Sequence, residues 1–350
     1  MAGITYKCPS CGGYLQFNPD TQTWQCPFCD SSFEEKELLE KADSYQHQAE
    51  QAAAQSEQGG EQVIYHCPSC GSEIMTDETT VATSCYYCHN PVVLQGKLTA
   101  DMKPDQVLPF TISKEKAMEQ FMKWVKGKRF VPKGFFSQAQ LNSMSGVYYP
   151  HFVSDCTVDG SFSGEGTNTS VMDMGKYIVT STKHFRVVRD GVITFKEIMR
   201  PALQKANRKL SDGIHPFPLE KAKPFSGAYL TGFLAERRDI EQEDVKADVE
   251  KEVERYVEPL LTSEMPYSGY HGSTSVTPRD TECKYVLLPT WVLTYPNRQN
   301  AKDPYYYAMN GCTGEVCGKL PLNKGKLWGV GLAVGAAVFA VGCLCSYLLF

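Results

Sequence analysis

Two heptapeptides decide how this chain begins to fold: Tyr6-Lys7-Cys8-Pro9-Ser10-Cys11-Gly12 and Tyr65-His66-Cys67-Pro68-Ser69-Cys70-Gly71. Each opens a set of four cysteines with one spacing, two Cys-x2-Cys pairs separated by 14 residues, and the second set repeats the first 59 residues later. Two cysteines separated by two residues converge from one tight turn, and two such turns supply four tetrahedral sulfur ligands. The predicted metal ligands are Cys8, Cys11, Cys26, Cys29, Cys67, Cys70, Cys85 and Cys88.

Each set of cysteines is therefore expected to form a zinc ribbon, in which the metal replaces the core that so short a segment lacks. All four ligands are cysteines, so no position remains for water, and such closed sites are structural rather than catalytic. The expected cofactors are two zinc ions, with iron as the alternative because four thiolates suit either metal. Short hairpins are expected inside the ribbons, Tyr14–Phe17 with Thr23–Gln25 and Glu73–Met75 with Val81–Thr83.

Charge and cysteine usage restrict the class of protein. The chain has 350 residues and a formal net charge of −5, which argues against the basic surface of a dedicated nucleic-acid binder. Fourteen cysteines would suit a secreted disulfide protein behind a signal peptide, but the stretch MAGITYKCPSCGG contains no apolar run. We therefore expect the cysteines to lie in the cytosol, where thiolates stay free to bind metal.

The composition and the motifs of the chain change along its length, and these changes predict five segments. The expected fold class is two small metal-stabilised zinc ribbons plus an α+β domain and one C-terminal transmembrane helix. The segments are ribbon 1 at 1–33, a helical or flexible linker at 34–61, ribbon 2 at 62–98, the α+β domain at 104–322 and the transmembrane helix at 327–350.

The α+β domain is predicted from alternating helix and strand signals. Helical spacing of apolar residues predicts one helix from a Ser113 cap to Lys126 and another over Glu241–Leu261. The dipeptide Asp190-Gly191 predicts a hairpin turn. The expected strands are Val147–Val153, Tyr177–Thr182, His184–Val188, Val192–Phe195, Tyr285–Leu288, Trp291–Tyr295 and Tyr305–Met309.

The last 24 residues, Leu327–Phe350, carry no charge and would extend about 36 Å as a helix, long enough to span a bilayer. Lys319, Lys324 and Lys326 precede this segment, and by the positive-inside rule they hold the N-terminal bulk in the cytoplasm. The predicted location is the cell membrane, with a single-pass C-terminal anchor.

A small-residue motif within this span bears on self-association. Gly331 and Gly335 form a Gly-x3-Gly face that would let two helices pair as a homodimer. Small residues are also common in membrane spans that do not pair, so both interpretations stay open.

Enzyme signatures are missing from the sequence. It contains no phosphate-binding loop, His-Glu-x-x-His pair, nucleophile elbow or dinucleotide fingerprint, so no catalytic residue is assigned. The histidines are scattered, and a lone histidine is usually structural or exposed. Cys312 and Cys317 could meet Cys156 or Cys283 in a third metal site, or all four could be buried as small apolar residues.

The order of motifs resembles a bacterial, mainly Firmicute, family of membrane-anchored proteins with tandem transcription-factor-IIB-type zinc ribbons, whose members are often labelled as primosomal helicase relatives. The resemblance covers nearly the whole chain, and it implies zinc, a membrane anchor and a scaffold near flotillin-like proteins, with no catalytic residues. The residues that carry it are Cys8–Gly13, Leu108–Phe110, Gly146–Pro150, Tyr229–Glu236, Leu287–Trp291 and Met309–Gly314.

These features favour a non-enzymatic adaptor that faces the cytosol, is fixed to the membrane and binds protein partners through its ribbons. The closed metal sites, the acidic ribbons and the anchor all support this interpretation. The alternative is a membrane-tethered binder of nucleic acid or of the transcription machinery, with Trp24, Phe28, Tyr86 and Tyr87 as stacking groups.

Overall fold

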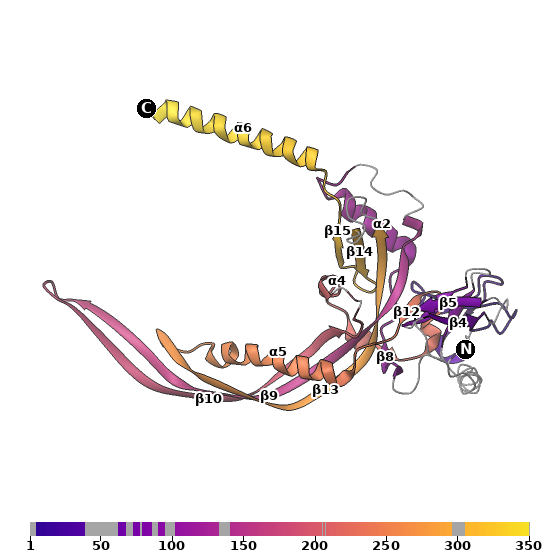
Figure 1. Cartoon of the computed structure of the whole chain (residues 1–350), viewed down its shortest axis with the longest axis horizontal. Helices are drawn as coiled ribbons and strands as arrows, with labels where there is room; N and C mark the ends of the chain where they lie inside the picture. Colours follow the sequence, from indigo (N-terminus) through magenta and orange to yellow (C-terminus); the bar gives the residue numbers. More distant parts are fainter. Residues whose placement is uncertain are drawn as a thin grey trace.

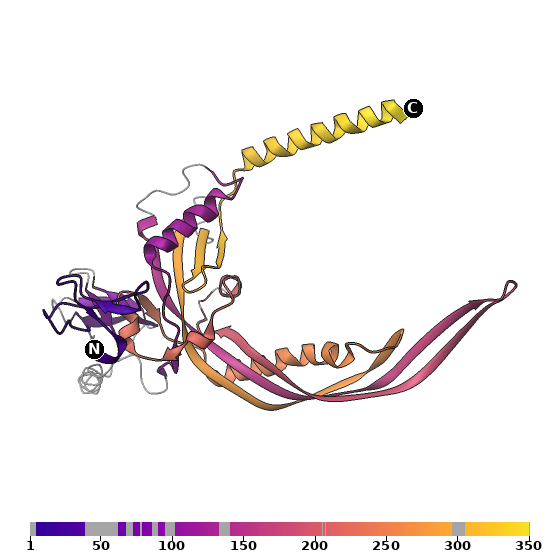
Figure 2. The same cartoon turned by 180° about the vertical axis from the view of Figure 1, so that it is seen from behind.

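The structure is a computed structural model of the chain. It describes residues 5–38, 62–67, 73–77, 79–85, 90–94, 102–132, 141–204, 206, 208–295 and 305–349. The described strands form a three-stranded sheet, a ten-stranded sheet and a two-stranded sheet, and Figures 1 and 2 show a long curved blade that extends from the folded body.

Three very long strands build this blade. β9 (Ser145–Asp173) pairs antiparallel with both β10 (Ile178–Pro201) and β13 (Gly269–Tyr295). The body end of the same sheet is completed by shorter strands: β6 (Thr80–Ser84), β7 (Pro91–Val93), β8 (Gln106–Val107), β11 (Lys223–Pro224), β12 (Leu234–Glu236), β14 (Tyr305–Asn310) and β15 (Val316–Lys319).

The predicted hairpin turn at Asp190-Gly191 is wrong, because both residues lie inside β10 and pair with Ser161 and Gly160 of β9. The reason is the packing of the helix α5 (Gln242–Thr262) on this part of the blade. A Cβ added at Gly160 would lie 2.6 Å from a methyl group of Val257, so glycine makes room for the helix. The true turn lies at the far end of the blade, between Asp173 and Ile178.

Helix α5 confirms the predicted second helix, and its apolar residues form one narrow stripe. Val245, Val249, Val253 and Val257 follow each other at intervals of four residues, and all are buried. This face packs on β9, β13 and β10 and covers one side of the blade near the body (Figure 1). The charged residues of the helix lie on the remaining face, as an amphipathic helix on a sheet requires.

The predicted first helix is also confirmed, as α2 (Lys114–Lys126) with Ser113 at its N-cap position. Its buried residues Ala117, Phe121 and Val125 lie on one face. Phe121 packs edge-on against Tyr307 of β14, with ring centroids 4.6 Å apart. The body also contains the short helices α4 (Arg208–Asp212), η3 (Leu219–Lys221) and η4 (Gly227–Leu230).

The first cysteine segment folds largely as predicted. β1 (Gln16–Asn18) pairs with β2 (Thr23–Gln25), which pairs in turn with β3 (Ser32–Phe33). The turn between β1 and β2 is held by Asn18, whose side-chain oxygen accepts a hydrogen bond from the Asp20 amide at 2.9 Å.

The second cysteine segment differs from the prediction. β5 (Glu73–Asp77) pairs with β4 (Gln62–His66), whereas β6 pairs with β7 and with β12 of the central sheet. The expected hairpin of Glu73–Met75 with Val81–Thr83 is therefore replaced by two separate pairings. Val81 and Ala82 are fully buried in the central domain. Burying this apolar surface in a large core stabilises the strand more than burial in a small ribbon would.

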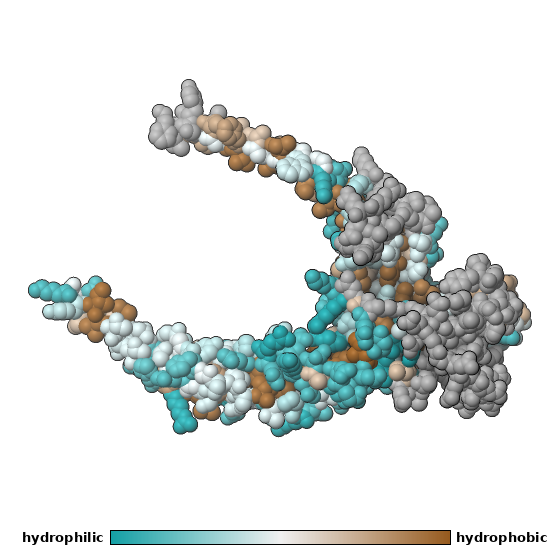
Figure 3. Space-filling view, in the orientation of Figure 1, coloured by the Kyte–Doolittle hydropathy of each residue, from teal (hydrophilic) through white to brown (hydrophobic). Residues whose placement is uncertain are grey.

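The C-terminal helix α6 (Lys324–Leu349) contains one candidate membrane span, Lys324–Cys343, with a mean hydropathy of 1.7 and none of it buried against the rest of the chain. Asn323 caps its first turn, since its side-chain oxygen accepts a hydrogen bond from the Lys326 amide at 3.0 Å. The helix extends away from the body (Figure 1), and its apolar side chains are open to the surroundings (Figure 3). It is long and apolar enough to cross a bilayer.

Candidate metal centre

Two tight turns position the four cysteines of the first set. In the first turn the Cys8 amide donates to the Gly13 carbonyl at 2.6 Å, and the Gly12 amide donates to the Cys8 carbonyl at 2.9 Å. The second turn repeats the arrangement, since the Cys26 amide donates to Ser31 at 2.9 Å and the Asp30 amide donates to Cys26 at 3.0 Å. Each turn needs a left-handed residue, supplied by Gly12 at φ +76° and by Asp30 at φ +54°.

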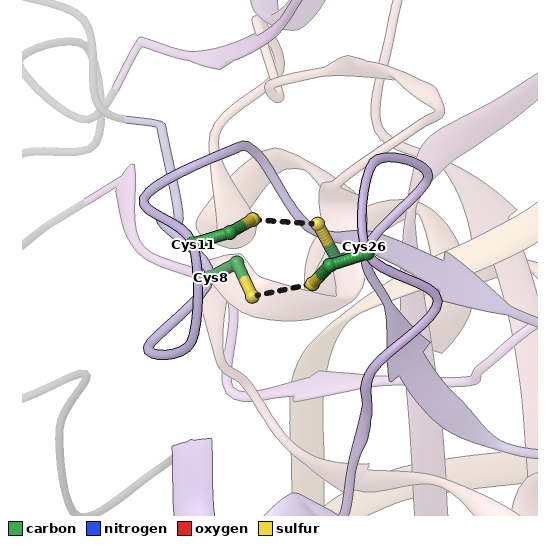
Figure 4. A group of neighbouring side chains, drawn as sticks. Cys8, Cys11 and Cys26 are labelled. Carbon is green, nitrogen blue, oxygen red and sulfur yellow. Dashed lines mark hydrogen bonds between the residues drawn. The ribbon is translucent and has the colours of Figure 1, made fainter.

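The sulfur atoms of Cys8, Cys11, Cys26 and Cys29 all lie within 4.8 Å of one another. Figure 4 shows Cys8 and Cys11 on one turn, facing Cys26 on the other. The Sγ atoms of Cys8 and Cys29 are 3.6 Å apart, and those of Cys11 and Cys26 are 3.4 Å apart. A tetrahedral ion with metal–sulfur bonds of about 2.3 Å separates its sulfurs by about 3.8 Å, so this cluster fits one ion with little adjustment.

The thiols of the cluster influence the pKa values of one another. Hydrogen bonding to the hydroxyl and to the backbone amide of Ser31 lowers the pKa of the Cys29 thiol to about 6. At Cys11 the Gly13 amide lowers the pKa, but the neighbouring thiols Cys29 and Cys26 outweigh it and raise the pKa to about 12. Four thiolates at this spacing repel one another, so all four ionise together only around a metal ion.

The cluster belongs to a ribbon that is docked on the central domain at η4. Trp24 is 1% exposed, and its indole nitrogen donates a hydrogen bond to the Ala228 carbonyl at 2.8 Å. Its ring packs between Phe17 and Tyr229, with both centroid distances 5.1 Å. The Phe17 amide donates to Thr231 at 3.2 Å. Trp24 is therefore a core residue and is not available to stack on a base.

An ionic contact extends the docking surface just after the ribbon. Glu35 accepts hydrogen bonds from the Tyr229 hydroxyl and from the Lys223 ammonium group. Burial raises the pKa of Glu35, but these two donors outweigh burial and hold it below its usual value. The carboxylate is thus charged at neutral pH and links the chain after β3 to η4 and β11.

Comparison with known proteins gives one extensive relationship. The chain is 31% identical over 341 residues to YdjG, an uncharacterized protein of Bacillus subtilis (strain 168), and the match covers 95% of each chain. The chain belongs to the YdjG family. No family model matches the chain, and no solved structure matches it. The relationship therefore extends over nearly the whole of both chains.

The second cysteine set of this YdjG-family chain is described in part. Cys67 and Cys85, the first member of each predicted pair, are both buried, with exposed fractions of 2% and 0%. Cys70 and Cys88 lie outside the described residues, as do Tyr86 and Tyr87. The structure therefore shows one complete cysteine cluster, and the second metal ion stays a prediction.

The four remaining cysteines of the body do not assemble into a third site. Among the described residues of this YdjG-family protein, the group able to hold a metal is the Cys8 cluster. The thiol of Cys312 donates to the Pro109 carbonyl at 3.2 Å, and burial raises its pKa to about 12. Ser154 donates to the Cys283 sulfur at 3.3 Å, while Cys156 is fully buried. Cys156 is buried, as the second interpretation expects, whereas Cys283, Cys312 and Cys317 are half-buried.

Two cavities of this YdjG-family chain have no signal in the sequence. A groove of about 550 Å³ lies where the first ribbon meets the central domain, lined among others by Gln16, Asp20, Glu115 and Phe233. A second, apolar cavity of about 380 Å³ is lined by His151 and Ser211, whose Nε2 and Oγ atoms are 2.7 Å apart. Both combine residues far apart in the chain, so local motifs could not reveal them.

Proposed function

We propose that the protein is a membrane-anchored adaptor, in which a zinc-bound ribbon and the central domain together bind a protein partner. The observation that carries this proposal is the closed Cys8–Cys11–Cys26–Cys29 cluster on a ribbon that is packed into the central core. A four-cysteine cluster leaves no coordination position for a substrate, so its role is to hold shape. The shape it holds forms one wall of the groove beside the central domain.

The metal is proposed to be zinc, and the second cysteine set is proposed to hold a second ion. Zinc accepts tetrahedral thiolate ligands without a redox change, which suits a site that builds structure. The sulfur spacing of the first cluster supports one tetrahedral ion. Iron, which also accepts four thiolates, is distinguished by its colour and by elemental analysis.

The proposed partner-binding surface is the groove at the junction of ribbon and domain. Its lining combines the β1–β2 turn with the start of α2 and the Gly146 and Gly232 regions, which belong to the motifs singled out in the sequence. Asp20, Asp30 and Glu115 line it together with Lys114, and Asp20 is paired with Lys116 at 2.8 Å, which leaves a small excess of acidic groups. An acidic groove of this size fits a basic, extended segment of a protein partner.

The anchor and its orientation complete the proposal. Helix α6 would cross the membrane, and the lysines before and at its start would keep the ribbon and the domain in the cytoplasm. The adaptor would then display its groove at the inner face of the membrane. Such a scaffold agrees with the flotillin-associated family that the sequence resembles.

Co-purification from detergent-solubilised membranes tests this function. The wild type should retain a protein partner that is lost from a Cys8→Ser variant and from Glu115→Lys, which reverses one charge in the groove. Glu119→Lys is the matched control, because Glu119 is also exposed on α2 but does not line the groove. Retention of nucleic acid in place of protein would contradict the adaptor, and so would equal partner loss in both lysine variants.

A further inference from the structure

The far end of the blade is an ordered turn. The strands β9 and β10 are joined by residues 174–177, where the Met174 amide donates to the Tyr177 carbonyl at 2.9 Å. The Gly175 amide donates to the Asp173 side chain at 2.8 Å, and Gly175 adopts a positive φ of +78°. The hydrogen bonds fix the turn as a blunt tip (Figures 1 and 2).

This tip carries five apolar side chains that are largely exposed. Val171, Met172, Met174, Tyr177 and Ile178 have exposed fractions between 63% and 73%. Val171 and Met172 are neighbours on β9 and point to opposite faces, so both faces of the hairpin end are apolar. Nearer the body, β10 alternates between more exposed and less exposed residues, whereas the residues at the tip are exposed on both faces. Figure 3 shows this apolar group near the end of the blade, followed towards the body by mostly white and teal surface with smaller brown patches.

The arrangement of the chain relates this tip to the anchor. In Figure 1 a straight line from the first turn of α6 to the hairpin tip leaves the body and the whole blade on one side. Helix α6 lies on the other side of that line. Figure 2 shows the same relation from behind. A membrane surface that follows this line would take α6 into the bilayer and touch the tip, while the curved blade arches over the lipid headgroups.

We propose that the hairpin tip is a second membrane contact, which inserts its apolar side chains into the lipid interface. Tyrosine, methionine and branched aliphatic side chains on a protruding turn suit that interface. Lys176 and Lys183 outnumber Asp173 at this end of a chain whose net charge is −5, which favours anionic headgroups. The proposal rests on the membrane anchor of the proposed function.

A protein surface is a poorer occupant of this tip. A stable interface between proteins buries about 800 Å² on each partner, from some twenty or more residues. The tip offers the side chains of one four-residue turn and the ends of two strands. Insertion into a bilayer does not require so large a contact area, because lipid surrounds the few inserted side chains on all sides.

Photo-crosslinking of the full chain in vesicles of phosphatidylcholine and phosphatidylglycerol tests the proposal. A diazirine amino acid replaces Tyr177 at the tip, Val192 as a matched control, or Leu332 within α6. Val192 lies on β10, the strand that follows Tyr177, and is 57% exposed, but it is nearer the body. After illumination, mass spectrometry identifies whether each position carries lipid or protein.

The expected result is lipid attached at Tyr177 and Leu332, with little at Val192. If Leu332 captures lipid but Tyr177 captures no more than Val192, the tip proposal is overturned and the anchor stands. If Tyr177 is crosslinked to a second copy of the chain, the tip is a protein contact and the proposal fails. If neither Tyr177 nor Leu332 captures lipid, the anchor fails together with the tip.

Discussion

Replacing Trp24 with alanine should destabilise the whole central domain, although Trp24 belongs to the small ribbon. The side chain is 1% exposed and packs against Phe17 and Tyr229 at centroid distances of 5.1 Å. Truncating a buried tryptophan to alanine typically lowers the free energy of unfolding by about 3–5 kcal/mol. The lost hydrogen bond to Ala228 adds little beyond this, because that carbonyl keeps the Thr231 hydroxyl as a donor at 2.7 Å.

Urea unfolding of the full chain in a mild detergent, followed by far-ultraviolet circular dichroism, measures this loss. A Trp24→Phe variant keeps most of the packing and should lose only about 1–2 kcal/mol. Phe28 is the control, since it lies on the same ribbon but is 66% exposed. Phe28→Ala should change the stability by less than about 1 kcal/mol. If Trp24→Ala left the unfolding of the β-rich domain unchanged, the ribbon would be an independent module and the docking argument would be refuted.

Three further predictions follow from individual sites. Gly12→Ala places a side chain at φ +76°, so the cluster should lose about 1–2 kcal/mol of metal affinity, seen as faster zinc loss to a chelator. Burial lowers the pKa of His151 to about 4, because the folded protein disfavours the charged imidazole. The contribution of His151 to the free energy of unfolding is therefore complete above about pH 6.5, and it is lost as the pH falls towards 4. The urea midpoint of the wild type should therefore drop between pH 7 and pH 5, and that of a His151→Gln variant should drop by less. An equal drop in both proteins would contradict this prediction. Deleting residues 324–350 should move the protein from the membrane to the soluble fraction, and persistent membrane association would show that another segment anchors it.

Features written in local sequence were predictable. The spacing of Cys8, Cys11, Cys26 and Cys29 specified a cluster because the two tight turns depend only on their own residues. The stripe of valines on α5 specified its buried face for the same reason, since helical periodicity is a local property.

Features that depend on distant neighbours were not predictable. Asp190-Gly191 has the composition of a turn, but α5 packs over this region and both residues continue the strand. Trp24 resembles an exposed stacking residue in the sequence, yet its partners Ala228 and Tyr229 are some two hundred positions away. The strand β6 does not form its predicted hairpin, because it pairs with β12 and is buried in the larger core of the central domain.

Elemental analysis of the full-length protein tests the central claim most directly. The wild type and a Cys11→Ala variant are purified in detergent without added metal, and their zinc and iron contents per chain are measured by mass spectrometry. We expect zinc in the wild type and about one zinc ion fewer per chain in the variant, because Cys11 supplies one sulfur of the complete cluster. Iron in the wild type would show that the metal is iron and not zinc. An equal metal content in both proteins would contradict a structural site at these four cysteines.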